Sequence, residues 1–282
     1  MPAKAYLQAL AAIGLWSTLA WLALELARVP PFLLVGSALV VGALCGLPRI
    51  RAWRVPPATL LLGVYGLFGF HFCLFLALRR APPVEANLIN YLWPLLIVAL
   101  APAFLPGTRL AARHVAGALA GFAGAALIVT GGRLELAAEH AAGYALAAAS
   151  AFIWASYSLL TKRVAPFPSA AVGLFCLVAG ALSLVMHALL EPPAGWSLAQ
   201  APLLVALGVG PMGAAFYLWD AALKNGDPRI IGSLAYLTPL GSTLLLVATG
   251  AGSFRPSTAA AMVLIVGGAA LGAGAWPRAR KR

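Results

Sequence analysis

Long apolar segments, separated by short groups of charged residues, follow one another along the whole chain. The segments that lack Asp, Glu, Lys and Arg comprise residues 5–24, 29–48, 55–78, 86–108, 115–132, 141–161, 164–190, 192–219, 230–254 and 256–277. A bilayer core is crossed by about 17 to 25 predominantly apolar residues of helix, so each segment is long enough to span it. The pattern predicts ten transmembrane helices joined by short loops.

The composition excludes a water-soluble fold. Hydrophobic residues make up 62% of the 282 residues and charged residues only 9%, whereas an ordinary soluble domain has about 25% charged residues. In a bilayer every backbone amide must be satisfied within a helix or a protein-lined cavity. We therefore expect an all-α integral membrane protein with no soluble domain.

The basic residues predict the orientation. Only five of the 19 Lys and Arg residues, namely Arg28, Arg79, Arg80, Arg133 and Arg255, fall on the side opposite to the N-terminus. Lys and Arg accumulate in short cytoplasmic loops, so both termini are expected in the cytoplasm. The net charge of +12 is thereby explained by topology, because a nucleic-acid-binding protein gathers its cations on one face or one helix. We expect the lipid bilayer, and no nucleic acid, as a partner.

The chain contains an internal repeat. Shifting the sequence by 145 positions places Ala77, Leu78, Pro83, Tyr91, Leu92, Pro94 and Leu95 on Ala222, Leu223, Pro228, Tyr236, Leu237, Pro239 and Leu240. A weaker match, at a shift of 138, places Trp16 on Trp154. The repeat predicts two units of five helices, residues 1–138 and 139–282. Because five is odd, equivalent helices cross the membrane in opposite directions, an arrangement typical of secondary transporters with a midplane substrate site.

Pro94 and Pro239 fall at equivalent positions near the middle of their segments. A proline lacks the N–H that would bond the carbonyl four residues earlier, so the carbonyls of Asn90 and Ala235 are expected to be free. A kink that serves only packing is one interpretation. Matched prolines in both halves favour a cavity or a hinge.

Polar residues share one face of the segment 86–108. Asn87, Asn90, Tyr91 and Pro94 recur at helical spacing. The matching face of the segment 230–254 keeps the aromatic residue, Tyr236, and the proline but has no amides. This asymmetry is expected if the first half holds most of the polar end of a substrate.

His71 is the ionisable side chain that lies deepest within a predicted helix. An ionisable residue at this depth is a functional hypothesis by default, and burial favours the neutral imidazole that forms hydrogen bonds. The alternative is a histidine satisfied by a helix carbonyl. Aromatic residues near the midplane could line a chamber for a flat solute; they are Trp16, Tyr91, Trp93, Trp154, Tyr157 and Tyr236.

Three stretches carry a family resemblance. Asn90-Tyr91-Leu92-Trp93-Pro94, Ala151-Phe152-Ile153-Trp154-Ala155-Ser156-Tyr157 and Leu15-Trp16-Ser17-Thr18 resemble the drug/metabolite transporter (DMT) superfamily, EamA type, and within it most closely the YddG aromatic amino-acid exporters. The resemblance covers essentially the whole chain. It implies a basket of helices around a central cavity and the export of aromatic and other neutral amino acids by alternating access.

The binding set that follows from the residues and the resemblance is His71, Asn87, Asn90, Tyr91, Trp93, Trp16, Trp154, Tyr157 and Tyr236, with Pro94 and Pro239 as hinges. An amino acid is the expected small-molecule substrate. Another small metabolite, such as a drug or a sugar derivative, is the alternative. Sugar phosphates are disfavoured because no predicted helix contains a Lys or Arg to pair with phosphate.

An intramembrane enzyme is the competing class of function. It would need a catalytic set such as paired aspartates or a zinc motif, but Asp220 is unpaired by sequence and no zinc motif occurs. We therefore expect no catalytic residues, metal or cofactor. The expected protein is a monomeric, multi-pass transporter of the bacterial inner membrane.

Overall fold

The computed structural model describes residues 2–254 and 256–274. Within these ranges all regular secondary structure is helical, and there is no strand. The α-helices are α1 Pro2–Ser17, α2 Leu19–Glu25, α3 Pro31–Leu44, α4 Pro57–Val64, α5 Phe70–Leu78, α6 Pro83–Asn90, α7 Trp93–Phe104, α8 Ala112–Thr130, α9 Ala141–Leu160, α10 Val172–Leu190, α11 Ala201–Val209, α12 Ala215–Asn225, α13 Pro228–Leu234, α14 Leu237–Ala248 and α15 Pro256–Ala273. The all-helical prediction is confirmed for this part of the chain.

Shorter segments join or interrupt these helices. The 3-10 segments are η1 Leu47–Trp53, η3 Ala138–His140, η4 Ser169–Ala171 and η5 Leu198–Gln200. Two segments have π-helical bonding, η2 Tyr65–Gly69 between α4 and α5, and η6 Gly210–Ala214 between α11 and α12. Single π-helical turns inside α-helices often mark functional sites.

The described residues form nine helical stretches long and apolar enough to cross a membrane. A tenth results if α3 and η1, which are bent by 92° relative to each other, count as one span. The sequence prediction of ten spans is met in that case. Arg255, Arg278, Arg280, Lys281 and Arg282, which entered the charge analysis, lie outside the described residues, as does the end of the segment 256–277.

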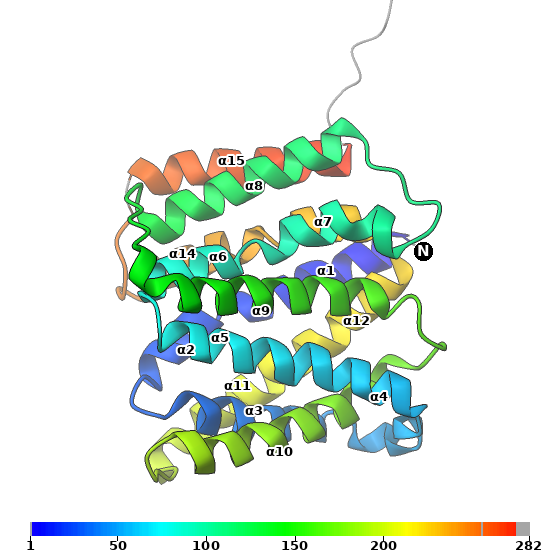
Figure 1. The fold of residues 1–282 in the computed structure, drawn as a ribbon, viewed down its shortest axis with the longest axis vertical. Coiled ribbons are helices and arrows are strands. Elements are labelled where there is room, and N and C mark those ends of the chain that lie inside the picture. Colours follow the sequence, from blue (N-terminus) through cyan, green and yellow to red (C-terminus); the bar gives the residue numbers. More distant parts are fainter. Residues whose placement is uncertain (1, 255, 275–282) are drawn as a thin grey trace, which may run out of the picture.

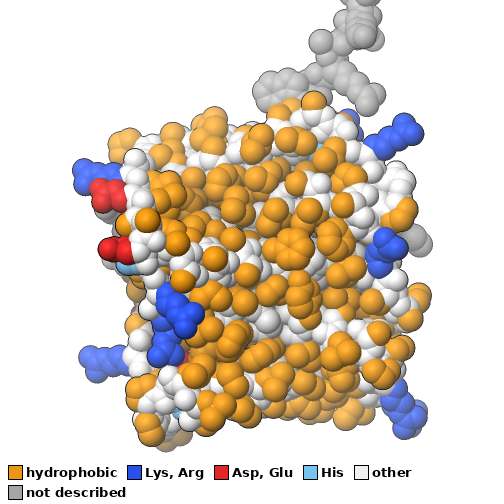
Figure 2. Space-filling view, in the orientation of Figure 1, with side chains coloured by type: hydrophobic (Ala, Val, Ile, Leu, Met, Phe, Trp, Pro, Cys, Tyr) orange, Lys and Arg blue, Asp and Glu red, His pale blue; other side chains and the backbone are white. Residues whose placement is uncertain are grey.

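The helices lie side by side and run roughly parallel or antiparallel to one another (Figure 1). α8 packs along α15 at one end of the molecule, and α3 packs along α10 at the other (Figure 1). On the face shown in Figure 2, Lys and Arg side chains gather where the helices end, and hydrophobic side chains cover the surface between. This distribution is that of a multi-pass membrane protein.

Matching interruptions occur in the two halves of the chain. The π-helical segments η2 and η6 begin at Tyr65 and Gly210, a separation of 145 positions, which equals the shift of the sequence repeat. Both proline-containing spans are also broken, between α6 and α7 and between α13 and α14.

Helix neighbours also correspond between the halves. α1 packs along α12, and the equivalent α9 packs along α5. α7 packs against α9 as α14 packs against α1. These relationships bring α1, α7, α9 and α12 together at the centre of the bundle.

Candidate functional site

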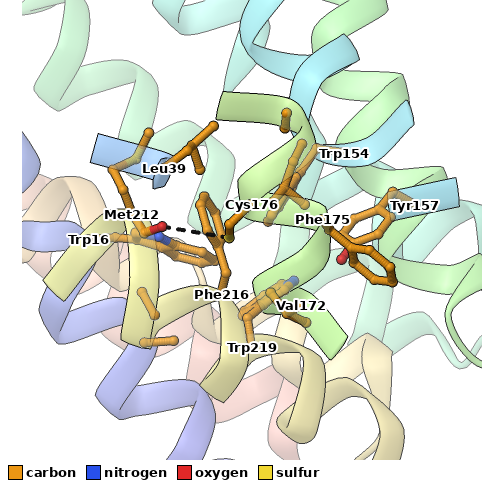
Figure 3. Close-up of a cluster of buried hydrophobic side chains, with 14 of the residues drawn as sticks. Trp16, Leu39, Trp154, Tyr157, Val172, Phe175, Cys176, Met212, Phe216 and Trp219 are labelled. Atoms are coloured by element: carbon orange, nitrogen blue, oxygen red, sulfur yellow. Dashed lines mark hydrogen bonds between the residues drawn. The ribbon is translucent and has the colours of Figure 1, made fainter. Parts of the chain in front are cut away.

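Four tryptophans and a phenylalanine meet at the centre of the bundle. Figure 3 shows Trp16, Trp154, Phe216 and Trp219 of this group. The ring centroid of Trp16 lies 6.3 Å from that of Trp93, 5.9 Å from Trp154, 6.0 Å from Phe216 and 5.1 Å from Trp219. Most of these pairs meet edge to face, the geometry that aromatic quadrupoles favour. We call these five residues the central aromatic cluster.

The π-helical segment η6 anchors one side of the central aromatic cluster. The indole N–H of Trp16 donates a hydrogen bond of 3.1 Å to the carbonyl of Pro211. Irregular backbone leaves carbonyls without helical partners, and inside a membrane a side chain must satisfy them. The orientation of Trp16 is thus set by the break in the helix opposite.

The other π-helical segment, η2, holds Tyr157 beside the cluster. The ring of Tyr157 lies 5.4 Å from that of Trp154. A Cβ atom on Gly66 would lie 2.3 Å from this ring, so only glycine admits Tyr157 here. The hydroxyl groups of Tyr65 and Ser156 lie 2.8 Å apart and add a polar contact between η2 and α9.

His71 borders the cluster and is buried. Its ring lies 5.0 Å from Phe70 and 6.3 Å from Phe216. Nδ1 lies 2.6 Å from the carbonyl oxygen of Leu67. A carbonyl only accepts, so Nδ1 carries the proton, and a neutral imidazole then presents Nε2 as an acceptor. Within the described chain Nε2 makes no hydrogen bond.

The bond to Leu67 bears on both interpretations of His71. The histidine is satisfied by a carbonyl of its own helix, four residues earlier, so its burial requires no substrate. The same bond fixes the tautomer, which leaves one nitrogen that can accept from an ammonium group. The open nitrogen of His71 is therefore a hydrogen-bond acceptor and not a donor.

Asn90 lies at the last turn of α6 and is 7% exposed. Its Oδ1 lies 2.8 Å from the hydroxyl oxygen of Ser150 on α9, and that hydroxyl also contacts the carbonyl of Ala147. Ser150 therefore fixes the side chain of Asn90 against α9. Asn87 and Tyr91, on the same segment, are partly buried.

Tyr236 lies apart from the central aromatic cluster. Its ring packs against Phe122, with 6.4 Å between centroids, and it belongs to a separate apolar cluster with Ala125, Leu240 and Ile265. Its hydroxyl group bonds to the backbone of the α6–α7 break. The nine residues predicted to bind substrate are therefore not all side by side in this structure.

The two prolines follow the helix breaks directly. Pro94 is the second residue of α7 and Pro239 the third residue of α14. The expectation that the carbonyl of Ala235 is free was wrong, because this oxygen accepts from the N–H of Thr238 at 3.0 Å. At the break in the second half the turn is tighter than an α-helical turn, because the N–H donor is three residues, and not four, after Ala235. The carbonyl that Pro239 cannot bond is satisfied in this way.

Sequence reasoning missed two residues at the centre. Phe216 contacts Trp16, Trp154 and His71. Trp219 contacts Trp16 and Trp93, and its indole N–H donates to the hydroxyl of Ser158 at 3.2 Å. Phe216 is the repeat equivalent of His71, and this equivalence could have identified Phe216 as a residue of the site from the sequence.

The cluster is closed in this structure. Trp16, Trp93, Trp154, Tyr157 and His71 are each at most 7% exposed. Two open cavities, of about 460 and 720 Å³, lie at opposite ends of the bundle, and neither is lined by any of these residues. A substrate would reach the cluster only after helices or side chains move.

Basic side chains tie helices together at the end that holds the larger cavity. Lys162 Nζ donates to the carbonyls of Leu223 and Gly226, at 2.8 and 2.9 Å. Arg163 donates to the carbonyl of Phe104 at 3.0 Å. These bonds join the end of α9 to the ends of α12 and α7 beside this cavity.

Comparison with known proteins gives consistent results. A model of the EamA-like transporter family matches residues 3–130 and again residues 141–273. The aromatic amino acid exporter YddG of Ancylobacter novellus is 46% identical over 270 residues, which cover 92% of this chain and 93% of the exporter. YddG of Escherichia coli is 29% identical over 264 residues, or 86% and 87% of the two chains. A solved crystal structure, 44% identical, matches with a TM-score of 0.92 over 96% of each chain.

Proposed function

Because the chain belongs to the EamA-like transporter family, we propose that it exports aromatic and other neutral amino acids across the bacterial inner membrane. The similarity to the aromatic amino acid exporters of Ancylobacter novellus and Escherichia coli supports this substrate class. The observation that carries the proposal is the central aromatic cluster beside His71, since its rings offer apolar faces and edges to a flat side chain.

The polar groups around the cluster suit the rest of an amino acid. Nε2 of His71 accepts from the ammonium group, and the amide of Asn90 contacts the polar end of the substrate from α6. The five residues of the central aromatic cluster are uncharged, and the nearby Asp220 already pairs with Lys224 at 2.7 Å. A substrate with a charged side chain would therefore be desolvated without compensation. Asn87, Tyr91 and Tyr157 complete the binding set.

Transport proceeds by alternating access between two inverted five-helix repeats, residues 1–138 and 139–282. The two separate matches of the family model, the equal spacing of η2 and η6 and the corresponding helix neighbours support this arrangement. Pro94 and Pro239 act as hinges where their spans are broken. Both termini face the cytoplasm, and the protein works as a monomer.

The end of the bundle where Lys162 and Arg163 join the helix ends is the cytoplasmic one. Lys162 and Arg163 lie there, on the side that carries most of the basic residues. Their bonds to helix ends hold this side shut, and substrate entry from the cytoplasm requires that they break.

Counterflow in proteoliposomes tests the function. Vesicles loaded with unlabelled tryptophan are diluted into labelled tryptophan, phenylalanine or methionine, with glutamate and lysine as charged comparisons. We expect saturable accumulation of the neutral amino acids only. If none of the three exchanges, the amino-acid assignment fails. Saturable exchange of an uncharged drug or sugar, without inhibition by amino acids, would support the alternative substrate class.

A further inference from the structure

The break between α6 and α7 has an inserted side chain. In an unbroken α-helix the N–H of Leu95 would donate to the carbonyl of Tyr91, four residues earlier. Here the N–H of Leu95 donates to the hydroxyl oxygen of Tyr236 at 3.1 Å. That hydroxyl in turn donates to the carbonyl of Tyr91 at 3.3 Å. A phenol from the second half of the chain thus replaces one helical hydrogen bond of the first half.

The fold provides a fitted place for this phenol. Tyr236 is completely buried. Gly121 on α8 faces its ring, and a Cβ atom at this position would lie 2.4 Å from Cδ2 of Tyr236. The small residue at position 121 therefore determines how far the ring can reach toward α6 and α7.

The arrangement has no counterpart in the other half. Tyr91 is the repeat equivalent of Tyr236, but within the described residues its hydroxyl group makes no hydrogen bond. A sequence shift of 144 positions matches Gly124-Ala125-Ala126-Leu127 with Gly268-Ala269-Ala270-Leu271. This alignment makes Ile265 the sequence equivalent of Gly121. The second half therefore has a branched side chain at the position equivalent to Gly121, so this difference between the halves is encoded in the sequence.

We propose that Tyr236 is a positioning residue of the transporter, whose hydroxyl group keeps the α6–α7 break open and thereby places Asn90 and Trp93 for substrate binding. Both residues adjoin the break, Asn90 as the last residue of α6 and Trp93 as the first of α7. When Tyr236 withdraws, Leu95 and Tyr91 can bond directly and the two half-helices join. Movement of α13 and α14 is in this way coupled to the geometry of the binding residues. The proposal rests on the proposed export function.

The first test removes only the hydroxyl group. In the counterflow assay, Tyr236→Phe should raise the half-saturating tryptophan concentration about tenfold, equivalent to about 1.4 kcal/mol. The maximal rate per folded transporter should change far less. A purely structural defect lowers the amount of active protein, and hence the maximal rate, at an unchanged half-saturating concentration.

The matched control is Tyr217→Phe. Tyr217 also donates from its hydroxyl to a backbone carbonyl, that of Gly42, at 3.2 Å, but it contacts α3 and not the α6–α7 break. It should leave the half-saturating concentration unchanged.

A second variant acts on Tyr236 from outside. Gly121→Ala should displace the ring and reproduce the effect of Tyr236→Phe, and the double variant should be no worse than either single one, because both changes remove the same contact. If Tyr236→Phe and Gly121→Ala fold and keep the wild-type half-saturating concentration, the proposal is wrong. If the wild-type protein exchanges none of the amino acids, the export function fails instead.

Discussion

Trp16 and Trp154, which the internal repeat places at equivalent positions, contact each other edge to face, with 5.9 Å between ring centroids and an interplanar angle of 73°. His71 and Phe216, a second equivalent pair, also meet, at 6.3 Å. In each pair one residue comes from the first half of the chain and the other from the second. The aromatic cluster therefore lies where the two halves of the chain meet, which is where transporters with repeated halves bind substrate.

Trp154→Leu should weaken tryptophan binding because it removes a ring that contacts Trp16, Trp93 and Phe216. We expect the dissociation constant to rise about tenfold or more, as for loss of a buried aromatic contact. Tryptophan binding to purified protein can be measured by calorimetry.

Phe152→Leu is the matched control for this change. Phe152 lies on the same helix but is 45% exposed on the outer surface. Equal losses of affinity in Trp154→Leu and Phe152→Leu would mean that the cluster has no special part in binding.

His71→Phe should weaken discrimination based on the ammonium group. Nε2 is the free acceptor in the structure, and phenylalanine keeps the ring but offers no acceptor. The wild-type protein should prefer tryptophan over indole-3-propionate, which lacks the ammonium group. In the variant this preference should fall about tenfold, in the range expected for one hydrogen bond to a charged group. Competition in the counterflow assay measures it, and an unchanged preference would assign His71 to packing.

The sequence predicted the helices better than the faces they present. Charge-free segments located the spans because lipid excludes charged residues from a helix. A helix that is apolar on all sides has no periodicity to show which side faces inward. Phe216 and Trp219 were missed for this reason, whereas Trp16 and Trp154 were found from their depth in their segments, from the repeat match and from the family resemblance.

Tyr236 shows a different limit. Its equivalence to Tyr91 suggested a shared role in binding, but the glycine at position 121 admits the ring of Tyr236, and the equivalent position in the second half, 265, is an isoleucine. Such a difference depends on contacts between distant segments, and periodicity within one segment does not reveal it.

Pro94→Ala and Pro239→Ala should slow exchange more than they reduce folded protein. Alanine restores an N–H and favours a continuous helix across each break. We expect exchange rates to fall about tenfold, since hinge changes alter the conformational step. Rates are compared per folded transporter, as determined by size-exclusion chromatography. Wild-type rates in both variants would contradict a hinge role.

Asp227 should contribute a stability that does not vary between pH 5 and 8. Burial raises the pKa of this carboxyl, but hydrogen bonds from Arg229 outweigh burial and hold the pKa below its ordinary value of 3.8. A carboxyl with a lowered pKa stabilises the fold at pH values above its ordinary pKa, and this contribution is lost as pH falls through the lowered value. Asp227→Asn should therefore lower the melting temperature by a constant amount above pH 5. A difference that changes steadily between pH 8 and 5 would contradict this assignment.

Lys162→Met should loosen the end of the bundle where Lys162 and Arg163 join the helix ends. Lys162 Nζ bonds the carbonyls of Leu223 and Gly226 at the end of α12, and methionine keeps the length of the side chain without its donors. Thr108 lines the cavity at this end, so a cysteine placed there, with Cys45 replaced by serine, reports opening through its reaction with a polar maleimide. We expect labelling to accelerate about threefold or more, because bonds from a charged donor contribute on the order of 1.5 to 3 kcal/mol.

Lys4→Met removes an exposed charge from the chain and should leave labelling unchanged. Equal labelling in Lys162→Met and the parent would show that these bonds do not hold the end closed.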